Sequence, residues 1–162
     1  MINIDLDLNG YRSKLCRNII EHFIKFIEEV SLEMENEITI TDEYGIGGRQ
    51  RVDIAFPKTY PKLFVEVDGE QHIKAVDKWG GEKGLEDRQV NDMLKETRLL
   101  MKDDENILIR FDHHYITYEE FKAKLVEYGV IPIIMAGNVQ GDSKLDSKYR
   151  KSKKKSKNIV RF

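Results

Sequence analysis

The chain has 162 residues, of which 40% are hydrophobic and 35% charged, a composition ordinary for one globular domain with a hydrophobic core. No apolar run reaches the roughly 18 residues of a membrane-spanning helix, and the opening segment, MINIDLDLNG, lacks the basic and apolar regions of a secretory signal. The single cysteine, Cys16, cannot form an internal disulfide, so we expect a cytoplasmic protein without a membrane partner.

The net charge of −2 conceals a division along the chain. Residues 144–162 carry nine basic residues and one acid, a net charge of +8, whereas the rest carries 18 basic and 28 acidic residues, a net charge of −10. We therefore expect a domain over residues 1–136 and a basic, disordered tail over residues 137–162. The tail offers phosphate-binding lysines, but the acidic body would repel nucleic acid unless divalent cations and local basic patches intervene. These lysines include Lys151, Lys153, Lys154 and Lys155.

Hydrophobic periodicity predicts the first half of the domain. Apolar residues at helical spacing predict a helix over residues 11–35. Alternating, β-branched segments predict strands over residues 37–41 and 50–56, separated by a glycine-rich turn at residues 44–48. The largely apolar run LFVEVDG, residues 63–69, predicts a third, mostly buried strand.

The second half begins with a glycine-containing loop. A helix is predicted over residues 85–102, and a fourth strand over residues 106–111. Thr117, with Glu120 three residues later, predicts a capping box at the start of a third helix. The run VIPIIM, residues 130–135, is compatible with a short edge strand or a buried coil. A helical crossover favours parallel pairing, so the order predicts a mixed α/β (α+β) fold with four to five central strands flanked by helices.

Carboxylates interrupt the apolar strands. Strand alternation places Glu66 and Asp68 on one face, and Asp53 on the preceding strand could face Glu66. Converging carboxylates predict a magnesium or manganese site, although each could also be an ordinary residue of a half-exposed strand. Burying them among apolar neighbours is costly unless a cation or donors meet them. In the following loop, Gln71 lies beside His72, which could act as a general base or orient a water.

These residues form part of a longer pattern. Its segments are FVEVDGEQHI, WGGE at residues 79–82, Gln89, Asn91, Asp92, Lys95 and ILIRF. Taken jointly, the pattern resembles the PD-(D/E)xK restriction-endonuclease-like superfamily. It is most similar to the branch related to very-short-patch-repair and phage homing-type endonucleases. The resemblance covers about residues 50–112.

The resemblance implies a restriction-endonuclease-like core that hydrolyses DNA phosphodiesters with a metal-activated water. Asp53 would be the central ligand of Mg²⁺ or Mn²⁺, with Glu66 and Asp68 near the metal. His72 would assist proton transfer or hold the scissile phosphate. From the second helix, Asp92 and Lys95 would support the site, with an ordinary solvated helix face as the alternative. Asp53, Glu66 and Asp68 would thus be catalytic and metal-binding, and His72 catalytic. The supporting residues would be Glu21, Gln71, Asp92 and Lys95.

The sequence departs from the family pattern at two places. Cys16 stands where a glutamate usually follows the start of the first helix, and Glu21 is five residues further on, so it points elsewhere on that helix. The usual E-x-K lysine is replaced by Asp68. Both departures leave a weakened or inactive enzyme open. Arg49 and Arg51 could contact phosphates or simply belong to an exposed strand.

The favoured expectation is a metal-dependent DNA endonuclease of a phage or mobile element, cytoplasmic in a bacterial or phage-infected cell. A homodimer is one arrangement left open. A nuclease of repair or branched DNA is the nearest competitor. A catalytically degenerate DNA-binding protein of the same fold is the second class, since it would bind DNA without cutting it. A third class is a protein-interaction factor whose acidic body meets a basic partner; it predicts no DNA affinity without the tail.

Overall fold

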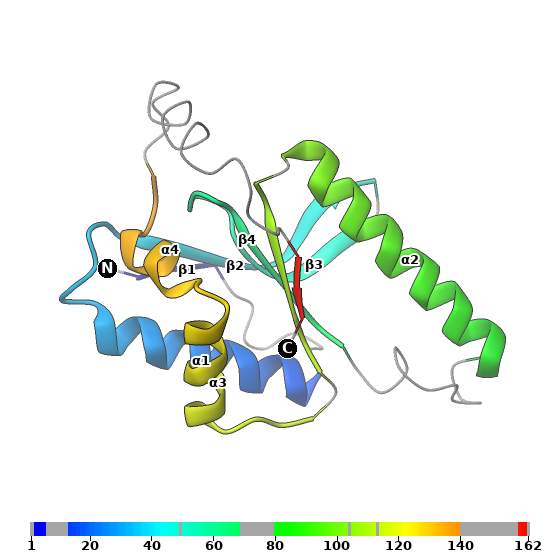
Figure 1. Cartoon of the computed structure of the whole chain (residues 1–162), viewed down its shortest axis with the longest axis horizontal. Coiled ribbons are helices and arrows are strands. Elements are labelled where there is room, and N and C mark those ends of the chain that lie inside the picture. Colours follow the sequence, from blue (N-terminus) through cyan, green and yellow to red (C-terminus); the bar gives the residue numbers. More distant parts are fainter. Residues whose placement is uncertain are drawn as a thin grey trace.

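The computed structural model describes residues 2–5, 13–48, 50–68, 80–103, 105–112, 114–139 and 159–161. Within these residues the chain forms a mixed α/β fold, a six-stranded sheet flanked by helices (Figure 1). The strands are β1 (Ile2–Asp5), β2 (Ile38–Gly47), β3 (Gln50–Phe56), β4 (Leu63–Val67), β5 (Ile107–Phe111) and β6 (Ile159–Arg161). The helices are α1 (Lys14–Val30), α2 (Gly81–Lys102), α3 (Tyr118–Glu127) and α4 (Ile131–Ala136).

The six strands lie side by side in sequence order. β2, β3 and β4 form an antiparallel meander, and α2 then crosses over so that β5 runs parallel to β4. This confirms the mixed sheet, the meander and the parallel crossover pairing predicted above. The first and last strands extend the sheet, because β1 pairs in parallel with β2 and β6 in parallel with β5.

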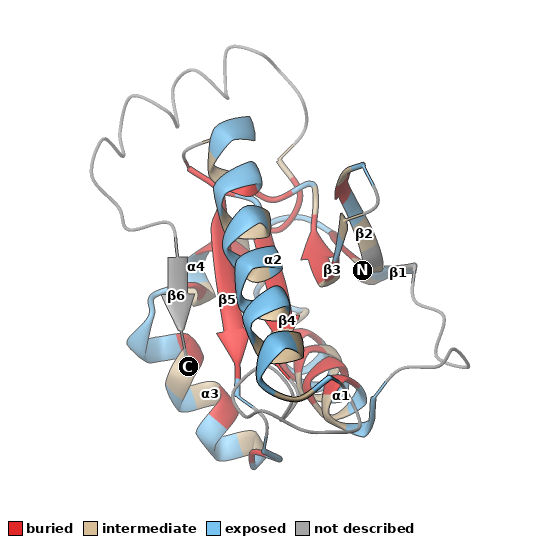
Figure 2. Ribbon diagram, turned by 90° about the vertical axis from the view of Figure 1, so that its right-hand side faces the viewer, coloured by how far each residue is buried: buried red, intermediate tan, exposed pale blue. Residues whose placement is uncertain are grey.

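One face of the sheet carries the main hydrophobic core. α1, α3 and α4 pack against it, and their apolar side chains form one cluster with those of the strands. Figure 2 shows the buried stretches of β4, β5 and α1 in red. The Ser13 hydroxyl caps α1 by accepting a hydrogen bond from the Cys16 N–H at 3.1 Å. On α3 the predicted capping box of Thr117 and Glu120 is confirmed. Along α1 the buried residues recur at helical spacing; they are Cys16, Ile19, Ile20, Phe23, Phe26 and Ile27.

The opposite face is covered by α2 and has a smaller apolar cluster. Leu99 is the one residue of α2 that is buried, and it packs with Phe64 of β4 and Leu108 of β5. Strand alternation separates the faces: Leu63 and Val65 of β4 belong to the main core, whereas Phe64 faces α2. The side chains at even-numbered positions of β4 and β5, such as Phe64 and Leu108, therefore face α2. The candidate site lies on this same face.

Three segments differ from their predictions. The run at residues 130–135 is helix α4 rather than a strand or coil, with a proline at its first turn, where a missing N–H costs nothing. β2 continues through residues 44–47, where a turn was expected. Its pairing register with β3 shifts between Gly45 and Gly47, as in a β-bulge. Ile159–Arg161 forms β6, within the segment expected to be disordered.

Gly137 ends α4 in a position that only glycine fits. Its φ is +70°, and a Cβ built there would lie 2.6 Å from the Asn36 carbonyl oxygen and 2.7 Å from that of Glu37. Replacement by alanine would therefore add a collision with backbone to a strained dihedral angle.

We expect Gly137→Ala to lower the free energy of unfolding by about 2–3 kcal/mol, measured by urea denaturation. Two matched controls separate the causes. Gly129→Ala shares the positive φ (+69°) but has no atom within 4 Å of the added Cβ, and Gly45→Ala meets neither problem. The loss of unfolding free energy should be largest for Gly137→Ala, smaller for Gly129→Ala and smallest for Gly45→Ala. Equal losses for the first two variants would show that the close contact with the backbone oxygens is unimportant.

Candidate active site

The strand meander brings two carboxylates together on the face covered by α2. Ile54 of β3 pairs with Val65 of β4, so the next position along each strand places Asp53 beside Glu66. The Asp53 carboxylate is held by the backbone, because its Oδ2 accepts a hydrogen bond from the Val67 N–H at 2.8 Å. The geometry thus orients Asp53 toward the end of β4.

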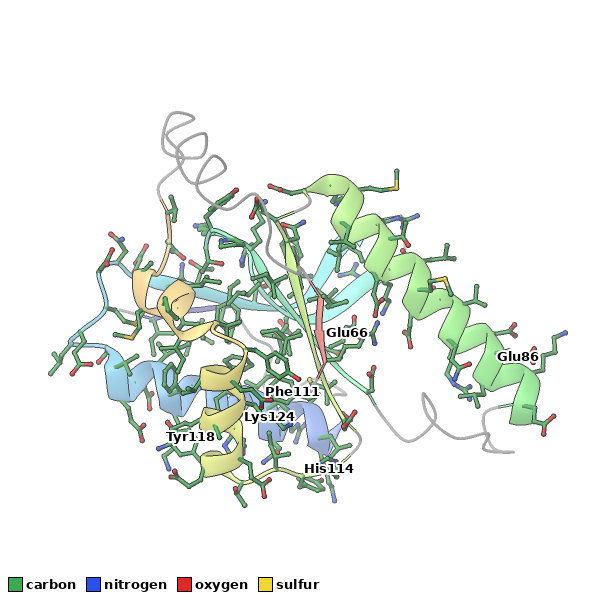
Figure 3. The ribbon with its side chains drawn as sticks, viewed as in Figure 1. Glu66, Glu86, Phe111, His114, Tyr118 and Lys124 are labelled. Atoms are coloured by element: carbon green, nitrogen blue, oxygen red, sulfur yellow. The ribbon has the colours of Figure 1, made fainter. Side chains whose placement is uncertain are left out.

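Glu66 is buried and faces a cation from α2. Lys95 Nζ lies 3.2 Å from Glu66 Oε1, with the two side chains 15% and 6% exposed. Burial is the main cause that raises the pKa of Glu66 to about 8, and the Asp53 charge adds to it, whereas Lys95 and Arg110 oppose the shift. Figure 3 shows Glu66 on the side of the sheet that faces α2. Burial and the Asp53 charge therefore favour the protonated form of Glu66, and Lys95 favours the charged form.

Arg110 of β5 lies next to Glu66 in the sheet and organises a second group of carboxylates. Its guanidinium is 2% exposed and contacts Asp68 at 2.9 Å, Glu96 at 2.9 Å and Asp92 at 3.8 Å. Burial lowers the pKa of Arg110, but the surrounding carboxylates raise it by more, so the group remains charged. Arg110 therefore links β5, the end of β4 and α2 through one buried cation.

The structure gathers only part of the expected ligand set. Asp53 and Glu66 approach each other, whereas Asp68 is bound to Arg110. Across the described residues, no group of three or more His, Cys, Asp and Glu side chains is arranged to hold a metal. The geometry thus offers two neighbouring carboxylates with a lysine, and a separate arginine-centred cluster beside them.

The supporting residues of α2 lie at the site. Asp92 and Lys95 both point from α2 toward the sheet and are largely buried, which is unlike a solvated helix face. Sequence reasoning missed Glu96 and gave Arg110 no role. Glu96 is four residues after Asp92, and helical spacing could have placed both on one face; the arginine that joins them is distant in sequence.

Other predicted residues lie elsewhere. Glu21 is exposed on α1, which packs on the opposite face of the sheet from α2. Cys16 is buried in the main core on that same side. Arg51 is exposed on β3. The remaining predicted residues fall outside the described part of the chain: Arg49, Gln71, His72, Lys151, Lys153, Lys154 and Lys155.

Comparison of the chain with protein-family models, curated proteins and solved structures finds no match. Among the helices that the structure describes, none combines the length and apolar character required to cross a membrane.

Removing the Arg110 charge should strongly destabilise the fold. We expect Arg110→Met to lower the free energy of unfolding by about 3–5 kcal/mol, because it leaves buried carboxylates without their cation. Urea denaturation measures this loss. Glu119→Gln, which breaks an exposed ion pair with Lys122, is the control and should cost less than about 1 kcal/mol. Similar losses in both variants would contradict the structural role given to Arg110.

The raised pKa of Glu66 predicts how stability depends on pH. Between the ordinary value of 4.5 and about 8, the folded chain keeps a proton that the unfolded chain has lost. Stability from this group is therefore complete below 4.5 and is lost as the pH rises through about 8.

In EDTA, we expect the Glu66→Gln variant to lose this part of the pH dependence, whose slope cannot exceed about 1.4 kcal/mol per pH unit for one proton. Denaturation midpoints across the window measure it. Glu86→Gln changes an exposed glutamate of α2 (Figure 3) and should keep the wild-type profile. An unchanged profile in Glu66→Gln would show that Glu66 titrates normally.

Proposed function

We propose that the chain is a metal-dependent endonuclease that hydrolyses DNA phosphodiester bonds. The observation that carries the proposal is the meeting of Asp53, Glu66 and Lys95, from β3, β4 and α2, at one face of the sheet. The order of elements from α1 to β5 is helix, three strands, helix and strand, which is compatible with the restriction-endonuclease-like core that the sequence pattern suggested.

The two carboxylates fit a divalent cation. Mg²⁺ is commonly bound through one or two carboxylates while it keeps several waters, and Asp53 and Glu66 supply two. Their mutual repulsion and the burial of Glu66 both disfavour two negative charges without such an ion. When bound, Mg²⁺ or Mn²⁺ would polarise a phosphoryl oxygen and lower the pKa of a water. Asp68 does not fit this ligand set, because Arg110 binds it.

Lys95 provides the positive side chain that the E-x-K position lacks. Although Asp68 occupies that position in the sequence, Lys95 reaches Glu66 from α2 at 3.2 Å. A buried ammonium group beside the reacting phosphate would stabilise negative charge that develops there. Arg110 acts as a positioning residue, because it binds Asp92 and Glu96 on either side of Lys95 and so fixes this turn of α2 against the sheet.

The DNA must approach an acidic body. The two side-chain cations of the site, Lys95 and Arg110, already contact carboxylates, so long-range attraction must come from elsewhere. The basic residues 144–162 are suited to hold phosphates without sequence preference. A bound divalent cation adds positive charge where the scissile phosphate would lie.

A catalytically inactive DNA-binding protein of the same fold is the second candidate. The pairing of Asp68 with Arg110 favours it, because this pairing withholds the third carboxylate. The two candidates share DNA binding and differ in cleavage. A nuclease specialised for repair or for branched DNA remains within the first candidate and differs only in substrate.

The deciding experiment is cleavage of supercoiled plasmid and of a branched DNA panel in Mg²⁺, Mn²⁺ or EDTA. We expect metal-dependent nicking or linearisation that falls at least about 100-fold in Asp53→Asn and Lys95→Ala, with partial recovery in Lys95→Arg. Glu86→Gln, exposed on α2, is the matched control and should cut like the wild type.

DNA binding by fluorescence anisotropy in EDTA should change little in Asp53→Asn, which would separate lost catalysis from lost binding. Binding without cutting on any substrate would support the inactive candidate. Cutting that survives Asp53→Asn would contradict the site assignment.

A further inference from the structure

α2 has an apolar stripe on the side that faces away from the sheet. Figure 2 shows the outward surface of α2 exposed along its length. Four apolar side chains on it are more than half exposed: Val90 at 54%, Met93 at 63%, Leu94 at 56% and Met101 at 83%. Together with Thr97 they occupy positions 90, 93, 94, 97 and 101, a spacing that places all five on one side of a helix. We call these five residues the α2 stripe.

The stripe is unusual because α2 is weakly buried in its own domain. Of its 22 residues only Leu99 is buried, and Asp92, Lys95 and Glu96 on the inner side make ionic contacts. A surface helix ordinarily turns its apolar side toward the core. Contiguous exposed apolar side chains in this arrangement mark a protein interaction surface.

A shallow groove adjoins the stripe. It has a volume of about 450 Å³ and is lined by residues of α2 and by the first residue of β3: Gln50, Leu94, Thr97, Arg98, Met101 and Lys102. Three of these residues, Leu94, Thr97 and Met101, belong to the stripe. Its lining is largely apolar, and Arg98 closes one side by donating a hydrogen bond to the Gly47 carbonyl at 2.7 Å. A flexible methionine side chain of a neighbouring molecule is suited to such a groove.

Charges along one edge of the stripe select the partner. Asp87 lies in the N-terminal half of α2, and Arg98 and Lys102 lie in the C-terminal half. At 3.6 residues per turn the three positions fall within about 60° of one another, on one edge of the stripe. When two copies of α2 pack antiparallel about a two-fold axis, the same edges face each other. With Met93 opposite Leu94 of the other copy, Asp87 lies level with the interval between the other copy's Arg98 and Lys102.

We propose that the α2 stripe is the contact between two copies of this chain, packed as antiparallel helices in a two-fold dimer. The contact does not cover the candidate site, because Lys95 lies on the inner side of α2, where it meets Glu66 of β4. The proposal does not depend on nuclease activity, since it rests on the exposure, spacing and charge of α2 alone.

Sedimentation velocity on the full chain over a range of micromolar concentrations tests the dimer. We expect a concentration-dependent dimer in the wild type that is lost in Leu94→Glu. Leu94 is exposed, so the monomer should keep its circular dichroism and melting temperature. Glu127→Lys on α3 is an exposed control that should leave the dimer intact.

A charge exchange tests the arrangement. Asp87→Lys alone and Lys102→Asp alone should each weaken the dimer about tenfold or more, because each places like charges opposite one another. The double variant should recover part of the affinity, because positions 87 and 102 attract again while the unchanged Arg98 repels the new charge at position 87. A wild-type chain that stays monomeric overturns the proposal, whatever else covers the stripe. A dimer that survives Leu94→Glu, or a double variant no better than the singles, also overturns it.

Discussion

The ion cluster around Arg110 is the constraint on which the candidate site depends. A guanidinium buried to this extent is tolerable only with carboxylates around it, and those carboxylates come from different elements: Asp68 follows β4, and Glu96 lies on α2. The cluster therefore fixes α2 against the sheet by charge where the apolar contact is small. Because Lys95 lies within the same helical turn, its position near Glu66 follows from this attachment.

Much of the fold follows from local patterns in the sequence. The meander, the crossover helix and the parallel β5 are predicted from periodicity, and the position of Asp53 beside Glu66 follows from two strands joined by a short turn. Strand alternation also separates the core side chains of β4 from Glu66. The meander and the Asp53–Glu66 pair join segments close in sequence, so local patterns are enough to predict them. The parallel pairing of β5 with β4 spans 44 residues, and it is predictable because a helical crossover favours parallel strands.

Other features depend on long-range pairing that no local pattern encodes. Asp68 has the spacing of a third metal ligand, but Arg110, 42 residues later, binds it. The short strands β1 and β6 acquire their structure by pairing at the two edges of the sheet, and in isolation each is too short to be distinguished from coil. The run that forms α4 is apolar throughout, so its periodicity cannot separate strand from helix.

The character of α2 follows from the surface that it covers. The sheet presents Glu66 and Arg110 to the helix near its middle and offers apolar contact mainly to Leu99 near its end. Residues on the inner side must therefore satisfy buried charges, and they are themselves charged. The apolar residues of the helix are left to the outer side. A helix with charged residues inside and apolar residues outside gains little free energy from burial within its own domain. The charges that build the candidate site therefore also account for the exposed apolar side of α2, where we propose that a second copy binds.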